Sequence, residues 1–202
     1  MSTLPILVEG VGLRVLVVGG GNVATRKARQ FAHAGAVVRI VAPALDAALE
    51  ELVLEFAMIV DRRPYGAGDI GDAQLVISAT NDRNVNAAVA RDALSEHRLL
   101  NAADHSTDGN FAMMATHQRG PLTIGVSAGG VPAAAIRIRD AIAVRFDSRY
   151  GDVLADLGAL RRRTIASGDS DRWRAGSPRL IDEDFCEAVE CGALSQRIAE
   201  WR

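Results

Sequence analysis

The stretch Val15-Leu16-Val17-Val18-Gly19-Gly20-Gly21-Asn22-Val23-Ala24 decides the fold of this chain. An apolar run comes first, three glycines follow, and the helix-forming run Thr25-Arg26-Lys27-Ala28-Arg29-Gln30 comes directly after them. This order is typical of a strand, a tight turn and a helix. In the pattern G-x-G-x-x-A, Gly19 makes the turn and Gly21 lets the backbone approach a pyrophosphate. Ala24 keeps the helix close to the strand.

The start of the expected helix completes a phosphate site. The unpaired N–H groups of Asn22 and Val23 and the positive end of the helix dipole would face the phosphates of a dinucleotide. A dinucleotide, NAD or NADP, is therefore the predicted cofactor. A glycine turn that only joins strand to helix is the alternative, but such a turn does not need glycines at both ends of the spacing.

One element of the dinucleotide fingerprint is missing. An acidic residue about 20 positions after the glycines would hold the adenosine ribose, but the second strand ends in Val41-Ala42-Pro43. Asp46 is the nearest carboxylate and is expected on the following helix. Ala42 and Pro43 are predicted to contact the cofactor, and no arginine stands beside them to bind a 2′-phosphate. The pattern alone leaves the choice between NAD and NADP open.

The composition is typical of a globular chain: 202 residues, 49% hydrophobic and 24% charged, enough for one domain and an appendage. The net charge of −2 argues against nucleic acid as the main partner. No apolar run approaches the roughly 20 residues that span a bilayer, and residues 1–5 lack the order of a signal peptide. We expect a cytoplasmic protein with no membrane partner. Cys186 and Cys191 match no metal or redox motif and are predicted to be ordinary thiols.

Strand and helix signals alternate through the first half of the chain. This rhythm predicts an α/β fold, a Rossmann-type doubly wound parallel sheet. The expected strands are Leu13–Val18, Val37–Val41, a short one near Glu55–Val60, Leu75–Ser78 and Leu99–Asn101, and the expected helices are Val23–Ala34, Leu45–Leu52 and Asn84–Ser95.

The carboxyl ends of the strands predict further site residues, because ligands of such sheets bind there. Ser78, Ala79 and Thr80 follow one strand and Asn101 ends another, so all four are expected beside the cofactor. Asp104 follows the last strand and is the predicted catalytic base, since partial burial raises the pKa of a carboxylate toward the working pH. A capping or turn carboxylate is the alternative for Asp104. A neighbouring histidine, His105, is more often a surface residue, and no metal site is predicted.

The rhythm changes after about residue 111. A strand over Leu122–Val126, a glycine turn and a helix from about Ala133 to Phe146 follow, and helical signals continue from Tyr150 with polar breaks at Ser167–Ser170 and Gly176–Pro178. Three parts are predicted: an NAD-binding domain (1–111), a small strand-and-helix module for dimerisation and substrate binding (112–149), and a helical C-terminal domain (150–202).

Arginines are frequent in and after the module. Arg137 and Arg145 lie eight residues apart and can share a broad helix face. Such a face could receive a polyanionic ligand through bidentate carboxylate contacts. A solvated surface balanced by Asp140, Asp147 and Asp152 is an equally good interpretation.

Four ordered motifs over about residues 4–146 resemble the precorrin-2 dehydrogenase/sirohydrochlorin ferrochelatase family, the N-terminal module of siroheme synthase. The segment 17–27 is similar to that family's V-G-G-G-x-V-A-x-R-K signature, and 79–86 to its A-T-x-D…V-N segment. The segment 101–104 resembles N-V-x-D, and 126–130 resembles V-S-S-G-G before the long helix.

The resemblance implies NAD-dependent oxidation of precorrin-2 to sirohydrochlorin, with Asp104 as the shared catalytic aspartate. Some members also insert ferrous iron to give siroheme, and the sequence leaves open whether this chain does. Ser127, Gly129, Gly130 and Arg137 are expected to bind the carboxylates of the tetrapyrrole. Ala128 replaces the second serine of the motif, a phosphorylated position in some relatives, so that form of control is not expected.

The family also implies an intertwined homodimer. The small apolar residues Ala112–Ala115, beside Leu122–Val126, would suit the contact between the two copies. Two other functions stay open. The first is a non-catalytic NAD-sensing or tetrapyrrole-binding protein on the same fold. The second is an unrelated hydroxy-acid dehydrogenase, which lacks support because no histidine or tyrosine–lysine pair stands at a matching catalytic position.

Overall fold

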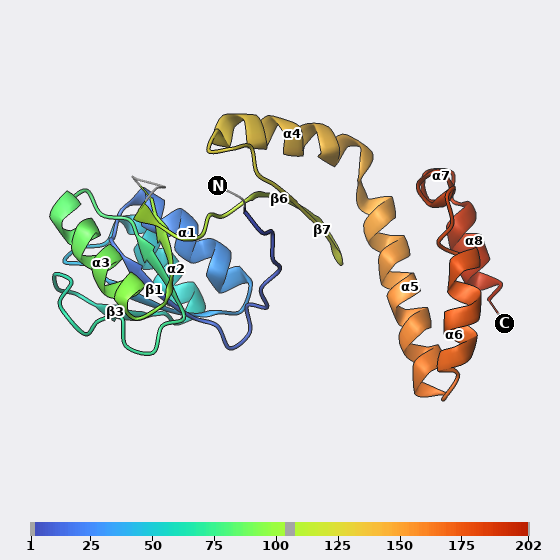
Figure 1. Ribbon diagram of the computed structural model, residues 1–202, viewed down its shortest axis with the longest axis horizontal. Coiled ribbons are helices and arrows are strands. Elements are labelled where there is room, and N and C mark those ends of the chain that lie inside the picture. The colour runs from blue at the N-terminus through green and yellow to red at the C-terminus, as the bar shows by residue number, and fades with distance from the viewer. Residues whose placement is uncertain (1–2, 104–107, 202) are drawn as a thin grey trace. The chain divides into compact units, whose positions relative to one another are not determined.

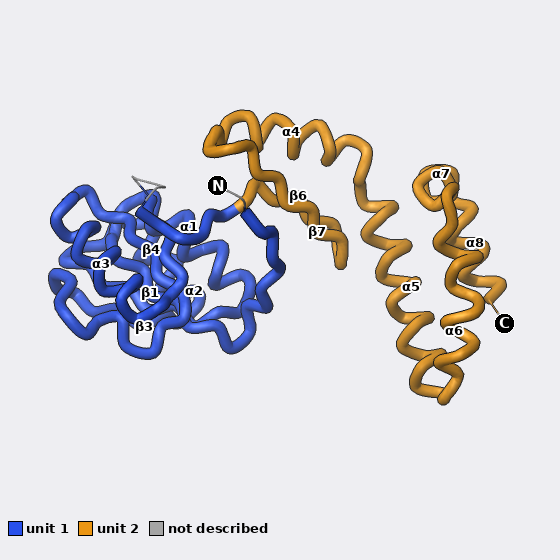
Figure 2. Tube along the Cα trace, in the orientation of Figure 1, with its two compact units in different colours: residues 1–113 blue, residues 114–202 orange. Residues whose placement is uncertain are grey.

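The computed structural model describes residues 3–103 and 108–201 (Figure 1). Backbone contacts divide the chain into two compact units, Met1–Met113 and Met114–Arg202 (Figure 2). The predicted helical domain and all of the predicted module except residues 112 and 113 fall in the second unit. The boundary between module and helical domain at residue 150 stays a prediction. Each unit is described by itself below.

The first unit is built on a five-stranded parallel sheet in the order β3-β2-β1-β4-β5. In register, Val18 at the end of β1 pairs with Val41 on one side and Ser78 on the other. The carboxyl ends of β1, β2 and β4 therefore meet at one edge, where such sheets bind ligands. The strands are β1 (Arg14–Val18), β2 (Val37–Val41), β3 (Ile59–Asp61), β4 (Leu75–Ser78) and β5 (Leu99–Ala102).

Three helices connect strands of this sheet. Because successive side chains of a strand point to opposite faces of the sheet, a separate core forms on each face. The helices are α1 (Asn22–His33), α2 (Ala47–Phe56) and α3 (Arg83–Ser95). One core packs Val15 and Val17 of β1 against small residues of α1 and leucines of α2. The other packs Leu16 and Val18 of the same strand against α3. The predicted doubly wound α/β fold is confirmed, with helices on both faces of the sheet.

Two predicted boundaries in this unit are wrong. The helix expected from Leu45 begins at Ala47, because the Asp46 side chain accepts a hydrogen bond from the N–H of Leu49 and caps the helix. It then continues to Phe56, so the strand expected near Glu55 starts only at Ile59. The residue after the helix, Ala57, caps it with a φ of 50°, in the left-handed region.

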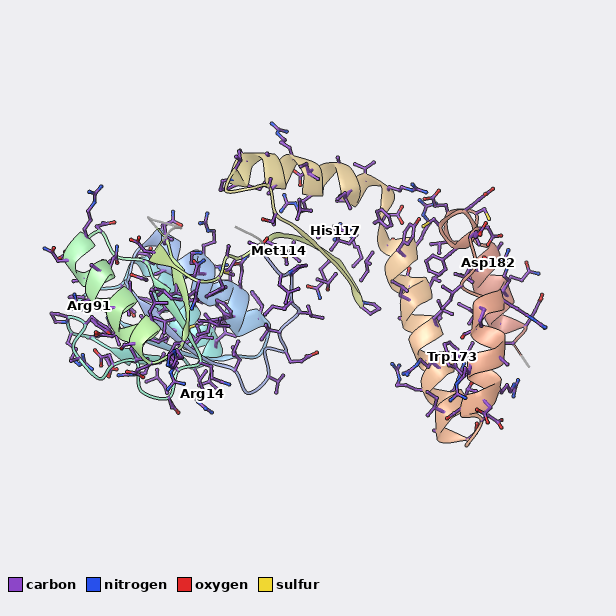
Figure 3. All side chains as sticks on the ribbon, viewed as in Figure 1. Arg14, Arg91, Met114, His117, Trp173 and Asp182 are labelled. Atoms are coloured by element: carbon purple, nitrogen blue, oxygen red, sulfur yellow. The ribbon has the colours of Figure 1, made fainter. Side chains whose placement is uncertain are left out.

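The second unit begins with an antiparallel hairpin and a long helix. The strands β6 (Ala115–Arg119) and β7 (Leu122–Val126) pair around a turn at Gly120, and α4 (Pro132–Arg145) contacts both strands. The sequence did not predict β6, because only one of its five residues, His117, is buried. The imidazole of His117 donates from Nε2 to the carbonyl oxygen of Phe146, 2.5 Å away. Figure 3 labels His117, and also Met114, which lies just before β6.

The remainder of the second unit is helical, as predicted. The elements are α5 (Ser148–Ala166), α6 (Ser170–Gly176), the 3₁₀ turn η2 (Ser177–Arg179), α7 (Phe185–Glu190) and α8 (Ala193–Ala199). A third core joins α5 to α7 and α8, with Tyr150 as its largest fully buried side chain. The thiols of Cys186 and Cys191 are free. Within the described ranges, no helix has both the length and the apolar character needed to cross a membrane.

Candidate functional site

The three glycines after β1 have three different roles. Gly19 has a φ of 128°, and a Cβ there would lie 2.2 Å from the carbonyl oxygen of Ala79. A Cβ on Gly20 would lie 1.9 Å from the carbonyl oxygen of Ala44. A Cβ on Gly21 would meet nothing within 4 Å. The first two glycines therefore let neighbouring loops pack against the turn, whereas Gly21 leaves open space beside the start of α1.

The first turn of α1 is free to bind an anion. Gly21 is the N-cap and brings no side chain, and the first turn holds no acidic residue. Thr25 is the first helix residue whose N–H bonds back, to the carbonyl oxygen of Gly21 at 3.0 Å. The N–H groups of Asn22, Val23 and Ala24 donate no hydrogen bond to any residue that the structure describes. These unpaired donors, the helix dipole and the space at Gly21 fit the pyrophosphate of a dinucleotide.

Asp46 fixes this turn from the side, a role that the sequence did not reveal. Its carboxylate accepts a hydrogen bond of 3.0 Å from Thr25 Oγ1, in the first turn of α1, as well as the capping bond from Leu49. The N–H of Asp46 donates to the carbonyl oxygen of Gly20 at 2.8 Å. The carboxylate therefore holds the glycine turn to α2. The spacing of 21 residues between Thr25 and Asp46 gave no signal for this pairing.

The end of β2 borders the same turn. Ala42 is buried, and Pro43 is exposed. Ala42 lies so near Gly20 that a Cβ added at Gly20 would lie 3.2 Å from the Cβ of Ala42. Both were predicted to contact the cofactor, and that role stays a prediction. Arg39 of β2 is already paired, because its guanidinium bonds to Asp61 and Asp69.

The loop after β4 is held by one asparagine of α3. Asn86 accepts hydrogen bonds of 2.8 Å from the hydroxyls of both Ser78 and Thr80, and its amide donates to the carbonyl oxygen of Thr80. Ser78 is fully buried, so its hydroxyl shapes the loop instead of lying at a surface. Ala79 and Thr80 are partly exposed beside Gly19. Of the three predicted residues, these two lie where a ligand at the glycine turn could reach them.

At the end of β5, Asn101 meets a lysine from α1. The ammonium of Lys27 lies 2.5 Å from Asn101 Oδ1 and 3.8 Å from the sulfur of Met113. The amide nitrogen of Asn101 donates to the carbonyl oxygen of Phe111 at 3.1 Å. Desolvation by burial, followed by repulsion from Arg26, lowers the pKa of Lys27 below its ordinary value.

The segment between Asn101 and Phe111 is closed at its base. Asn110 accepts a hydrogen bond from the N–H of Leu100 at 2.7 Å, and its amide donates to the carbonyl oxygen of Arg98. A Cβ on Gly109 would lie 2.6 Å from the carbonyl oxygen of Leu100. The predicted base Asp104 and its neighbour His105 lie within this segment but outside the described residues.

The predicted substrate residues all lie in the second unit. Ser127, Gly129, Gly130 and Arg137 are exposed, and both glycines have positive φ values, 55° and 84°. A Cβ on either glycine would meet nothing within 4 Å. These residues lead into the N-terminus of α4, which begins with Pro132.

Several of the arginines in and after the module are paired with carboxylates instead of free. Arg145 pairs with Glu190 at 2.7 Å, and Arg149 pairs with Asp147 at 2.8 Å. Arg139 bonds to the neighbouring Asp140. For these three side chains the interpretation as a charge-balanced surface is the better one. Across residues 3–103 and 108–201 no group of three or more metal-ligating side chains comes together.

A family profile described as "Putative NAD(P)-binding" matches residues 6–115. The chain belongs to this family. The matched range covers the whole parallel sheet and the glycine turn of the NAD(P)-binding unit, which agrees with the anion site at α1.

Curated relatives and a solved structure extend this NAD(P)-binding assignment. The siroheme synthase of Pseudomonas putida strain F1 is 41% identical over 199 residues, and that of Azotobacter vinelandii is 37% identical over 204. Each alignment covers 98% of this chain but 41% of the relative, so the chain spans about two fifths of their length. A solved structure, "SirC, precorrin-2 dehydrogenase", superposes with a TM-score of 0.80 at 27% identity, over 98% of this chain and 100% of that one. The family predicted from the four motifs is thereby confirmed.

Proposed function

We propose that this protein is an NAD-dependent dehydrogenase that oxidises precorrin-2 to sirohydrochlorin in siroheme biosynthesis. The observation that carries the proposal is the likeness to SirC, because it includes both units and leaves no part of either chain unmatched beyond a few residues. The siroheme synthase relatives, which match the same 98% of this chain, support the same pathway.

The first unit supplies the cofactor site. The N–H groups of Asn22, Val23 and Ala24 bind the pyrophosphate, and the missing side chain of Gly21 gives it room. Asp46 and Asn86 hold the two loops on either side of this site. Ala42, Pro43, Ala79, Thr80 and Asn101 contact the remainder of the dinucleotide. The NAD supplies a hydride acceptor when it is bound.

Asp104 serves as the general base. Oxidation of precorrin-2 removes two hydrogens, one as the hydride and one as a proton, and the proton needs an acceptor. In the sequence, Asp104 follows the last residue of β5 by two positions. A positioned carboxylate of this kind contributes about 10²- to 10⁴-fold to rate.

The second unit contributes to binding of the substrate. The eight carboxylates implied for the tetrapyrrole need donors, and Ser127 and the backbone of Gly129 and Gly130 offer them before α4. Arg137 is exposed on the first turns of that helix and adds a guanidinium.

The working form is a homodimer formed through the second unit. A two-stranded sheet is too small to be stable alone, and α4 buries only Ala135 within its own unit. Apolar side chains of α4, among them Ile136 and Ile138, are left exposed. Light scattering at micromolar concentration tests the dimer, and a monomer would contradict it.

An anaerobic assay tests the function. Enzymatically generated precorrin-2 and NAD are mixed with the protein, and formation of sirohydrochlorin is followed by its absorbance. We expect turnover with NAD, and loss of turnover with retained NAD binding in Asp104→Asn. Absence of oxidation with both NAD and NADP would refute the enzyme and favour a binding protein on the same fold. Repeating the assay with ferrous ion tests the second reaction, since insertion faster than the uncatalysed control would make iron a substrate.

A further inference from the structure

Lys27 is a half-buried charge that the proposed chemistry has not yet used. It lies in the second turn of α1, and its side chain reaches Asn101 at the carboxyl end of β5. Its contacts are an amide oxygen of Asn101 and the thioether of Met113. Within the described chain it forms no ion pair with a carboxylate.

The two contacts do not balance the charge of the ammonium. A lysine has three N–H donors, of which Asn101 takes one and the sulfur of Met113, a weak acceptor, a second. Removing an ammonium from water is costly unless an anion compensates for it. An anion brought by a ligand would supply that compensation.

The surroundings of Lys27 identify where the ligand would lie. Leu100 of β5 points into the α3 side of the sheet, so the alternating side chain of Asn101 points to the α1 side, beside Lys27. Phe111, which accepts the hydrogen bond from Asn101, packs on that same side. Lys27 therefore lies beside Asn101 and Phe111, the residues at which the segment 101–111 begins and ends.

We infer that the Lys27 ammonium binds a carboxylate of the tetrapyrrole substrate and orients it at the end of β5. This inference rests on the proposed function, because it assumes a polycarboxylate substrate at this edge of the sheet. Asn101 holds the ammonium in place through its Oδ1 atom. The charge selects for anionic side chains on the substrate, and the pyrophosphate of the cofactor is bound separately by the N-terminus of α1.

The test compares three variants of the full chain. Lys27→Met removes the charge and keeps the length, Lys27→Arg keeps the charge, and Arg29→Met removes a charge from the exposed face of the same helix. For each variant, calorimetric titration gives the Kd of sirohydrochlorin and of NAD, the anaerobic assay gives KM for precorrin-2, and thermal unfolding gives Tm.

We expect Lys27→Met to raise the sirohydrochlorin Kd and the precorrin-2 KM about 10- to 100-fold, the range of a hydrogen bond to a charged group. Lys27→Arg should recover most of this loss, and Arg29→Met should stay within about twofold of the parent. The NAD Kd of Lys27→Met should match the parent, and its Tm should fall only slightly, because the hydrogen bond to Asn101 Oδ1 is lost but no ion pair is broken.

Three results would overturn the inference. An unchanged sirohydrochlorin Kd in Lys27→Met would show that no substrate carboxylate is bound there. A raised NAD Kd would assign Lys27 to the cofactor, and a sirohydrochlorin Kd that rises only in proportion to the loss of Tm across the three variants would assign it to the fold. If the parent oxidises precorrin-2 and Lys27→Met binds sirohydrochlorin as tightly as the parent does, only this inference is refuted. If the parent neither binds sirohydrochlorin nor oxidises precorrin-2, the proposed function is refuted.

Discussion

Helices α1 and α4 have similar lengths, 12 and 14 residues, but they meet their surroundings differently. Helix α1 buries Ala24, Thr25, Ala28 and Ala32 against the sheet of its own unit. Helix α4 buries only Ala135, while Ile138 is 48% exposed and Val144 is 81% exposed. The contrast teaches that α1 is packed within its own unit, whereas α4 leaves apolar side chains exposed, which the proposed dimer would cover. Four experiments test the two sides of this comparison.

The largest expected effect comes from the turn that starts α1. In Gly20→Ala the new methyl group would lie 1.9 Å from the carbonyl oxygen of Ala44, so backbone must move and stability should fall by about 3 kcal/mol. In Gly21→Ala the methyl group meets open space, so the fold should keep its stability while NAD affinity falls. Circular dichroism melts and NAD titrations separate the two variants. Equal Tm values for both would contradict the packing described for Gly20.

The next effect concerns the uncovered helix. Ile138→Glu on α4 should raise the dimer Kd about 100-fold if a second copy covers this face, since a charge would be buried without a partner. Leu94→Glu on α3, a residue 41% exposed, is the matched control and should change nothing. Sedimentation measures the dimer Kd. Ile138→Glu that associates like the parent would remove α4 from the interface.

A smaller effect is expected at the buried carboxylate of the first unit. The guanidinium of Arg63 holds the pKa of Asp69 at about 2, below its ordinary 3.8. Because the folded pKa is the lower one, this stabilisation is present above about pH 4 and is lost as the pH falls toward 2. Asp69→Asn should lower the free energy of unfolding by about 1 to 2 kcal/mol at pH 7. The loss is no larger because Arg63 is half-exposed and solvent screens its charge. Urea unfolding at pH 7 and at pH 3 should show the difference shrinking in acid.

The smallest expected effect is a loss of stability at Tyr150 in the second unit, and it should change at alkaline pH. Burial and hydrogen bonding to Glu190 raise the pKa of Tyr150 above its ordinary 10.0. Because the folded pKa is the higher one, this stabilisation is present below pH 10 and is lost as the pH rises above it. Tyr150→Phe should cost about 1 kcal/mol at pH 7. Urea unfolding at pH 7 and 10.5 checks this, and an equal cost at both pH values would be evidence against the assignment.

Much of the first unit could be predicted from the sequence. Apolar runs bounded by glycine located β1, β2 and β4, and the spacing of Gly19, Gly21 and Ala24 located the start of α1, because each signal is local. Strand β6 was missed because four of its five residues are not buried and carry no apolar alternation. The start of α2 was misplaced because Asp46 acts as a cap, and a carboxylate looks the same in sequence whether it caps a helix or lies within it.

The site could be predicted less completely. The anion-binding end of α1 followed from its glycines, but the contacts between Thr25 and Asp46 and between Lys27 and Asn101 join residues 21 and 74 positions apart. Such pairs are set by the way helices cross the sheet, which no local pattern records. Ser78 was expected at the cofactor by its place after β4, yet its side chain points inward to Asn86.

The third core gives the molecule an optical asymmetry. The chain has two tryptophans, and both Trp173 and Trp201 lie in the second unit, their ring centroids 6.0 Å apart. Indole emission excited at long wavelength therefore comes from the second unit alone, while the parallel sheet is silent. Fluorescence would follow the second unit alone, whereas far-ultraviolet dichroism would follow the helices of both units. Any difference between the two curves recorded on one sample would reveal one unit opening before the other.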